Sequence, residues 1–292
     1  MGTLNRNVML SPSHCHPERS EGSAFSLRVN SAKQLLFAAL RKSSSFAALT
    51  MTIAACSRGV TVGSSPGAVE QPAAPNTLTA REQREGWKLL FDGKSLSQWR
   101  AYQQDTTPAR AKKDSIGPMW TIVNGVITKT RPGDDIVTKE KFGDFEFAFD
   151  WKVSPRGNAG VFYRADESQN KVYWSAPEFQ IADDSLTPDS RNPLTSAGAA
   201  YGFYAAPRGV AKFGGNWNSS RIVAKGNHIE HWMNGVKTIE YEIGSPDWLT
   251  KYEGSKFKPY PNWGRNKSGY LSIQGDHGGS LELRNLKIRV IK

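Results

Sequence analysis

Residues 144–153, Asp-Phe-Glu-Phe-Ala-Phe-Asp-Trp-Lys-Val, decide the fold of this chain. The odd-numbered positions from Phe145 to Val153 are all large and apolar, and the even-numbered positions between them are small or charged. Successive side chains of a β-strand point to opposite faces of the sheet, so this alternation is typical of a strand with one buried face. The stretch therefore predicts a β-strand that lines a core on one side only.

Two Asn-Gly dipeptides predict the turns between further strands. Asn124-Gly125 and Asn234-Gly235 are each flanked by short runs rich in apolar and β-branched residues. Asn and Gly accept the positive φ values that a type I′ turn requires at both of its central residues. Each dipeptide therefore predicts a two-residue β-hairpin.

The last apolar stretch predicts a strand with an irregularity. Its apolar residues fall on odd positions up to Leu283 and on even positions from Leu286 onward, which indicates a β-bulge at Arg284-Asn285. Residues 88–291 hold roughly ten to thirteen strand patterns and no convincing long helix. So many strands predict an all-β fold, a jelly-roll sandwich of two antiparallel sheets.

Composition divides the chain into three parts. A short apolar run after two basic residues ends in Ile53-Ala54-Ala55-Cys56, which resembles a bacterial lipobox, where the Cys thiol becomes lipidated. We predict an export segment over residues 1–55, of which about the first 34 lie outside the native product. A flexible Gly-, Ser- and Pro-rich tether over 56–77 and a folded domain over 78–292 follow.

Charge and cysteine usage exclude several classes of protein. The net charge is +11, and residues 1–55 contribute +4 of it through six basic and two acidic residues. The remainder has no basic run typical of a nucleic-acid arm, so the charge does not predict binding to nucleic acid. No Cys follows Cys56, so the domain has no internal disulfide. We predict an exported, periplasmic or cell-envelope lipoprotein that meets a membrane only through a lipid on Cys56.

A capping box at 79–82 predicts a two-turn helix that ends at Gly86.

Residues 178–184, Glu-Phe-Gln-Ile-Ala-Asp-Asp, form the sharpest candidate strand for a functional site. Alternation directs Phe179 and Ile181 to the core and leaves Glu178 and Gln180 together on the opposite face. An edge strand whose polar side only meets water would have the same pattern, so both interpretations stay open.

Arg164 belongs to the preceding strand pattern and shares a face with Phe162. If the two strands are neighbours, Arg164 can approach Glu178, where its charge would keep the carboxylate ionised or bind a substrate oxygen. A buried structural arginine is the alternative interpretation.

Three histidines follow the tether: His228, His231 and His277. His231 shares parity with apolar neighbours, which is typical of a core residue, although it is also a candidate base. His277 follows Asp276 in a Gly-rich loop, where it can reach a groove rim or a metal. The spacing of the three histidines does not predict a zinc site.

The tryptophans indicate a sugar-binding surface. Trp174 and Trp217 lie in surroundings rich in Gly, Ser and Asn, so we expect both to be partly exposed. An exposed indole beside polar groups is a natural platform for a sugar ring. The domain has no Gly-rich phosphate loop, Gly-x-Ser-x-Gly elbow or thiol nucleophile, which disfavours nucleotide and serine-hydrolase chemistry.

Taken together, these residues resemble the 3-keto-disaccharide hydrolase family. The resemblance opens with Gly86-Trp87-Lys88-Leu89-Leu90-Phe91-Asp92-Gly93 and continues in the order of the family. The further matching motifs are Asn158 to Arg164, Glu178 to Asp183, Asn216 to Asn218, His231 to Gly235, Gly269 to Gln274, Asp276 to Gly278 and Arg284 to Leu286. The resemblance implies a concanavalin A-like jelly roll that acts on disaccharides or glucosides oxidised at carbon 3 of a glucosyl ring.

The resemblance also implies a reaction. A ketone at carbon 3 acidifies the proton on carbon 2, and its removal gives an enolate that expels the glycosidic oxygen from carbon 1. Water addition completes a net hydrolysis. We assign His231 or Glu178 as the base and Arg164 as the enolate or hydroxyl clamp. No cofactor follows from the sequence, although a divalent metal ion could replace Arg164 as electrophile. The expected substrate-binding residues are Gln180, Asp183, Trp174, Trp217 and His277.

Two other classes of function stay open. In a conventional glycoside hydrolase, Glu178 and Asp183 would be the acid and the nucleophile, although strict alternation puts them on opposite faces unless a bulge intervenes. A non-catalytic, lectin-like module would need only the Trp-rich groove.

Overall fold

The computed structural model describes residues 74–102 and 116–292. These residues belong to one compact unit. The predictions about the export segment, Cys56 and most of the tether fall outside the described residues. Within the described part, no helix has both the length and the apolar character needed to span a membrane.

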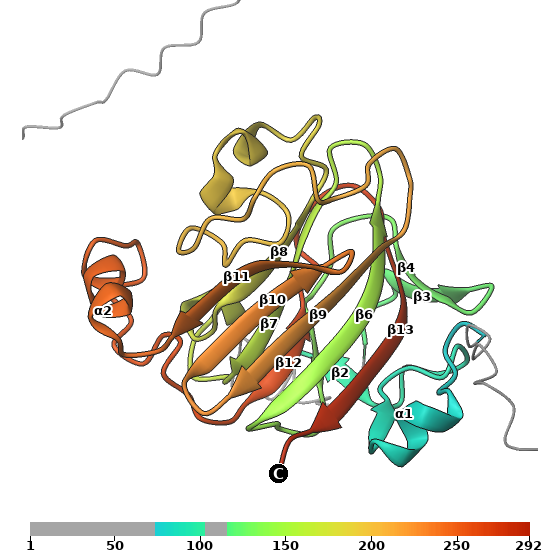
Figure 1. Ribbon diagram of the computed structural model, residues 1–292. Helices are drawn as coiled ribbons and strands as arrows, with labels where there is room; N and C mark the ends of the chain where they lie inside the picture. The colour runs from blue at the N-terminus through green and yellow to red at the C-terminus, as the bar shows by residue number, and fades with distance from the viewer. Residues whose placement is uncertain (1–73, 103–115) are drawn as a thin grey trace, which may run out of the picture. The chain divides into compact units, whose positions relative to one another are not determined.

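Thirteen strands and two short α-helices make up the described domain (Figure 1). The helices are α1 (Ala80–Arg84) and α2 (Pro246–Glu253), and three 3-10 turns are η2 (Val172–Trp174), η3 (Pro188–Arg191) and η4 (Pro193–Thr195). The strands are β1 (Trp87–Leu89), β2 (Trp99–Ala101), β3 (Trp120–Val123), β4 (Val126–Lys129), β5 (Ile136–Thr138), β6 (Phe145–Val153), β7 (Asn158–Ala165), β8 (Glu178–Ala182), β9 (Asn218–Lys225), β10 (His228–Met233), β11 (Val236–Glu242), β12 (Tyr270–Ile273) and β13 (Leu281–Val290).

The strands form two antiparallel sheets, as the sequence predicts. The larger, eight-stranded sheet has the order β11-β10-β9-β6-β13-β4-β3, and β1 pairs with β13 beside it. The five-stranded sheet has the order β2-β5-β12-β7-β8. Figure 1 shows the larger sheet in front of the smaller one, the two layers of a β-sandwich.

Local sequence signals account for the main elements. Phe145, Phe147, Phe149 and Trp151 of β6 are almost completely buried between the sheets, which confirms the predicted alternation. Both Asn-Gly turns have positive φ at Asn and Gly, as type I′ turns require. The register of β13 against β6 shifts between Arg284 and Lys287, and this confirms the predicted bulge.

The two helices were predicted less well. The capping box is present, since Thr79 accepts from the Glu82 amide and Glu82 accepts from the Thr79 amide, but α1 ends at Arg84. It is therefore shorter than the two turns expected. Helix α2, which begins after the N-cap Ser245 with Pro246 in its first turn, was missed. Its buried residues are Trp248 and Tyr252, which lie one turn apart on the same side of the helix.

Candidate active site

A cavity of about 300 Å³ lies over the outer face of the five-stranded sheet. Its floor comes from β7 and β8, and its walls come from η2, from the loop after β12 and from two longer connections. The lining residues are Asn158, Tyr173, Trp174, Ala176, Glu178, Gln180, Tyr201, Lys256, Phe257, Gln274, Asp276 and His277. The cavity combines carboxyl, amide, imidazole and ammonium groups with aromatic rings, as expected for a site that binds a polar ring.

Glu178 is a buried carboxyl group on the floor of this cavity. Its residue is only 8% exposed. Burial raises the pKa of Glu178 to about 8, although the charge of Lys256 lowers it. The negative charges of Asp135 and Asp276 raise the same pKa further. A carboxyl group that titrates near neutral pH can both accept and donate a proton during a reaction.

Gly160 makes room for the Glu178 side chain. On the neighbouring strand β7, Gly160 pairs with Gln180, and Glu178 pairs with Phe162. The Glu178 side chain reaches across to Gly160, where a Cβ atom would lie 2.0 Å from Glu178 Oε1. Any residue with a side chain at position 160 would therefore displace the carboxyl group.

The Gln180 amide lies against the Glu178 carboxyl group, and the Asn158 amide lies against Gln180. Gln180 is completely buried. With its amide nitrogen toward Glu178, it donates to Oε1 at 3.1 Å and to the Ala159 carbonyl at 3.3 Å. In the opposite orientation of the Gln180 amide, Nε2 donates instead to Asn158 Oδ1 at 3.0 Å. The Gln180 amide is thus in contact with the Glu178 carboxyl group, and Asn158 and Gln180 both line the cavity.

The segment after β12 adds two buried acceptors. The Gln274 backbone amide donates to the Gly160 carbonyl at 2.9 Å, which ties this segment to β7. Gln274 is 4% exposed, and its Oε1 has no hydrogen-bond partner among the described residues; the same holds for Asp276 Oδ1. Buried acceptors of this kind favour a ligand that donates hydrogen bonds, such as a sugar with free hydroxyl groups.

Aromatic side chains form one wall of the cavity. Trp174 stacks on Tyr260 with ring centroids 4.4 Å apart and an interplanar angle of 16°. Tyr173 meets Trp174 edge-on at 4.5 Å. Trp174 and Tyr173 are half-buried, so their remaining surface is open to a ligand. Phe257 and Tyr201 line the same cavity.

The structure brings together four of the residues singled out from the sequence: Glu178, Gln180, Trp174 and His277 all line the cavity. Alternation correctly separates Glu178 and Gln180 from Phe179, which lies in the core. The roles assigned to these four residues stay predictions.

The predicted approach of Arg164 to Glu178 is wrong. The register of β7 against β12 shifts between Ser272 and Tyr270, and Arg164 has a φ of 53°. This bulge breaks the alternation, so the Arg164 side chain does not line the cavity. Its guanidinium donates to the carbonyls of Gly143 and Gly226 at 2.9 and 2.8 Å, and to Asp144 at 3.0 Å. Arg164 is a buried structural arginine.

His231 lies in the core rather than in the cavity. It is completely buried. Its Nε2 is 3.0 Å from the Tyr163 hydroxyl and its Nδ1 is 3.2 Å from the Gly198 carbonyl. Burial lowers the pKa of His231 to about 3, so the ring is neutral at physiological pH. The structure favours the core interpretation of His231.

Asp183 and Trp217 also lie outside the cavity. Asp183 accepts from the backbone amide of Arg156, between β6 and β7, at 2.9 Å and from that of Ser185, after β8, at 3.1 Å, so it joins these two turns. Trp217 lies under Arg284, whose guanidinium is 4.1 Å from the ring centroid. Neither residue is placed to orient a sugar ring in this cavity.

Sequence reasoning missed several cavity residues. Asn158, Gln274 and Asp276 stood inside matched motifs, and their position in those motifs was the available signal. Tyr201 and Lys256 follow loops and turns whose paths no local pattern predicts. They reach the cavity through the tertiary fold alone.

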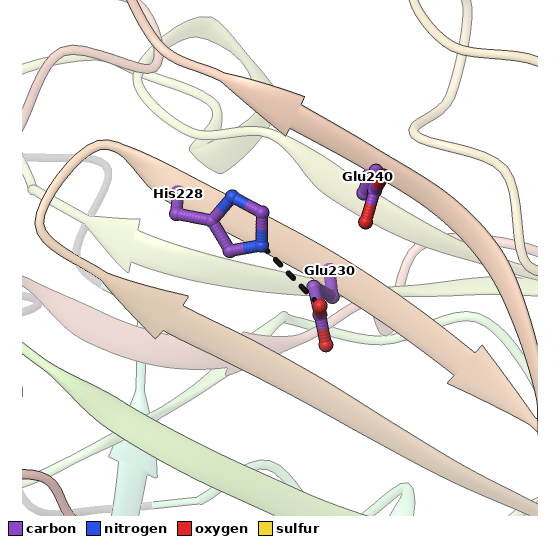
Figure 2. A group of neighbouring side chains, drawn as sticks. All are labelled: His228, Glu230 and Glu240. Carbon is purple, nitrogen blue, oxygen red and sulfur yellow. Dashed lines mark hydrogen bonds and ion pairs between the residues drawn. The ribbon is translucent and has the colours of Figure 1, made fainter.

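A second group of polar side chains lies on the outer face of the other sheet (Figure 2). His228 and Glu230 of β10 and Glu240 of β11 are, within residues 74–102 and 116–292, the one group of three metal-ligating side chains whose donor atoms all lie within 4.8 Å. Lys237 forms ion pairs with both glutamates, and His228 pairs with Glu230 at 3.3 Å. The group is a surface ion-pair network. The cavity residues Glu178, Asp276 and His277 do not meet this spacing, so we derive no step through a metal ion.

Comparison with known proteins agrees with the fold. The sequence profile of the 3-keto-alpha-glucoside-1,2-lyase-like domain matches residues 86–289. The 3-keto-disaccharide hydrolase of Bacteroides thetaiotaomicron is 30% identical over 253 residues, which cover 75% of this chain and 83% of that protein. These matches identify the class, a carbohydrate-active hydrolase. The chain belongs to the 3-keto-alpha-glucoside-1,2-lyase-like family, as its resemblance predicted.

Two solved structures support the same assignment. A candidate glycosyl hydrolase from Parabacteroides distasonis, solved at 1.70 Å, is 29% identical with a TM-score of 0.68, over 75% of this chain and all of that one. A second one from the same organism, solved at 2.00 Å, is 28% identical with a TM-score of 0.54, over 70% of this chain and 99% of that one. Both span the domain described above.

Proposed function

We propose that this protein cleaves 3-keto glucosides, among them 3-keto disaccharides, in the cavity around Glu178. The main support is the Glu178 carboxyl group, which is buried in the cavity against Gly160 and has a pKa that burial raises to about 8. The name of the Bacteroides relative supports the oxidised sugar as substrate.

Glu178 is proposed to remove the proton from carbon 2. The ketone at carbon 3 takes up the electron pair of the broken C–H bond as an enolate. The enolate then re-forms the ketone, a double bond forms between carbons 1 and 2, and the bond from carbon 1 to the glycosidic oxygen breaks. The leaving oxygen takes a proton, and water can add to carbon 1 to give the free 3-keto sugar.

Other cavity residues supply the remaining needs of this reaction. Lys256 brings positive charge to the cavity, as its effect on the Glu178 pKa indicates, and can stabilise the enolate oxygen. His277 is a candidate to protonate the leaving oxygen. Gln274 Oε1 and Asp276 Oδ1 can accept hydrogen bonds from sugar hydroxyls, and Trp174 offers an aromatic surface to the ring.

The alternatives are less well supported. A conventional glycosidase built on Glu178 and Asp183 would need both carboxyl groups at the sugar, but Asp183 lies outside the cavity and is bound to the backbone of the turns before β7 and after β8. A purely sugar-binding module would have no need of a buried carboxyl group with a raised pKa.

The test is turnover of a 3-keto disaccharide beside its unoxidised parent, with products identified by mass and NMR, with and without a chelator. We expect cleavage of the oxidised sugar only. Equal cleavage of the parent would favour a conventional glycosidase, and binding without cleavage would favour a lectin-like module. Activity that is lost with a chelator and returns on adding a divalent ion would indicate that a metal ion, rather than Lys256, stabilises the enolate oxygen.

We further propose that the protein is an envelope lipoprotein held through Cys56, because the lipobox-like motif precedes a flexible tether. In a bacterial host, Cys56→Ser should abolish labelling by a palmitate analogue and release the domain into the soluble fraction. Unchanged labelling of the variant would contradict the anchor.

A further inference from the structure

Two buried side chains of opposite charge, Asp135 and Lys129, hold the loop that carries Asp276 and His277. Asp135 directly precedes β5 and is 2% exposed, and Lys129 ends β4 and is 1% exposed. Neither residue lines the cavity. Both are charged groups that a protein rarely buries without a specific partner.

Asp135 holds the beginning of the loop. The Gly275 amide donates to Asp135 Oδ1 at 2.7 Å, and the Gly133 amide donates to the Gly275 carbonyl at 2.8 Å. The fit leaves no room for a side chain, since a Cβ atom at Gly275 would lie 2.2 Å from the Asp134 carbonyl oxygen. Gly275 is therefore fixed against residues 133–135 by two hydrogen bonds and by close packing.

Lys129 holds the next turn of the same loop. Its Nζ donates to the His277 carbonyl at 2.7 Å. Burial lowers the pKa of Lys129, and the negative charges of Asp276 and Asp135 oppose that effect. A third contact comes from Lys171, whose Nζ lies 3.5 Å from Asp276 Oδ2. Asp276 lies between Gly275 and His277, and the backbones of both are held by hydrogen bonds, so its own position is restricted.

We propose that Asp135 and Lys129 are positioning residues, which hold Gly275 and His277 by their backbones so that the Asp276 and His277 side chains line the cavity beside Glu178. The kinetic part of this inference rests on the proposed function. The placement of the loop does not, because it follows from the hydrogen bonds alone.

The charge of Asp135 acts on the cavity as well. Its negative charge is one of the causes that raise the pKa of Glu178. Burial raises the pKa of Asp135 itself to about 7, although the Gly275 amide lowers it. The charged and titratable groups around Asp135 are Asp134, Asp276, Lys171, Lys129, Glu178, Tyr102 and Tyr173. Removing the Asp135 charge should therefore lower the Glu178 pKa.

Two substitutions at position 135 separate the hydrogen bond from the charge. Asp135→Asn keeps an oxygen that can accept from Gly275, so kcat should stay within about threefold of wild type while the pH inflection of the rate moves to lower pH. Asp135→Ala removes the acceptor, and kcat should fall about tenfold or more, because catalytic groups tolerate little misplacement.

Two further variants complete the set. Lys129→Met keeps an unbranched side chain of similar length but loses the bond to His277, and it should lower kcat as Asp135→Ala does. Asp134→Asn is the control, since this exposed neighbour loses the same charge without a hydrogen bond to the loop, and its kcat should stay within about twofold of wild type.

Amide hydrogen exchange at Gly275 tests the placement without any substrate. Wild type and Asp135→Asn should protect this amide, and Asp135→Ala should not. Protection equal to wild type in a folded Asp135→Ala would overturn the positioning role, and so would a wild-type kcat in that variant. An unshifted pH inflection in Asp135→Asn would overturn the electrostatic part. Failure of wild type to cleave any 3-keto sugar would overturn the proposed function instead, and the exchange result would still decide the role of Asp135.

Discussion

Each outer face of the sandwich has a glutamate on a strand of alternating polar and apolar residues, Glu178 on β8 and Glu230 on β10, yet the two carboxyl groups have different surroundings. On the eight-stranded sheet, burial raises the pKa of Glu230, but hydrogen bonds from Trp232 and from two basic side chains outweigh it and leave the pKa below its usual range. On the five-stranded sheet, Glu178 has a pKa of about 8. Alternation decides which face of the sheet a side chain occupies. The loops over that face decide whether a carboxyl group is ion-paired or is buried with a raised pKa.

The covering loops explain the difference. Over the five-stranded sheet, η2 and the segment from Gln274 to His277 shield Glu178 from water. Glu230 stands on a face where Lys237 and His228 lie within ion-pair distance. A carboxylate paired in this way is a poor base, because its charged form is already stabilised.

The largest effect should come from filling the space under Glu178. Gly160→Ala would put a methyl group 2.0 Å from Glu178 Oε1, and because the flexible carboxyl group can yield, the variant should fold. We expect kcat/KM on a 3-keto glucoside to fall by about a hundredfold, as loss of a general base does. Gly117→Ala is the control, because its Cβ would meet nothing closer than 3.9 Å. Wild-type activity in Gly160→Ala would remove Glu178 from the reaction.

The rate should depend on the ionisation of Glu178. Because burial raises the pKa of Glu178 to about 8, the basic form is scarce at pH 6, and kcat/KM should rise about tenfold per pH unit until it levels off near pH 8. A pH–rate profile of the free enzyme measures this directly. A profile that is flat from pH 6 to 9, or that falls as pH rises, would contradict a role as base.

His231 should affect stability rather than catalysis. His231→Asn breaks the hydrogen bond to Tyr163 in the core, and it should lower the free energy of unfolding by about 1–3 kcal/mol. Since burial lowers the pKa of His231 to about 3, wild type should also lose stability as pH falls below about 6.5, where only the unfolded chain takes up the proton. Thermal melts and kinetics of the folded fraction check this. A large loss of kcat in stable protein would restore His231 as base.

The smallest effect should come from the ion-pair network on the other sheet. Burial lowers the pKa of His228, but Glu242 and Glu230 outweigh it and leave the pKa raised. The stabilisation is therefore complete below about pH 6.5 and disappears as pH rises through the folded-state pKa. His228→Gln should cost less than about 1 kcal/mol at low pH, and salt should reduce this further. Urea titrations at two salt concentrations give the measurement; a change in turnover would show that this face takes part in function.

Much of the fold was predictable because its signals are local. The alternation of β6, the two Asn-Gly turns and the bulge in β13 each depend on a few adjacent residues. The same locality put Glu178 and Gln180 on one face. It also explains the error at Arg164, where one extra residue in β7 turns the side chain away and nothing in its neighbours marks the bulge.

The rest of the site depends on contacts between distant residues. Asp135 and Gly275 are 140 positions apart, and Lys129 and His277 are 148 apart. No periodic pattern links such pairs, so the sequence could name His277 as a loop residue but could not show what holds it. The core position of His231 was visible as parity with its apolar neighbours, and that signal was the correct one.

The most direct test makes the same substitution on both faces. Glu178→Gln and Glu230→Gln each remove one carboxyl group at nearly constant size, and turnover of a 3-keto disaccharide is measured for both beside their melting temperatures. We expect a loss of about a hundredfold or more for Glu178→Gln, with its fold intact, and activity within about twofold of wild type for Glu230→Gln. Normal turnover by Glu178→Gln, or an equal loss in both variants, would contradict the placement of the active site on the five-stranded sheet.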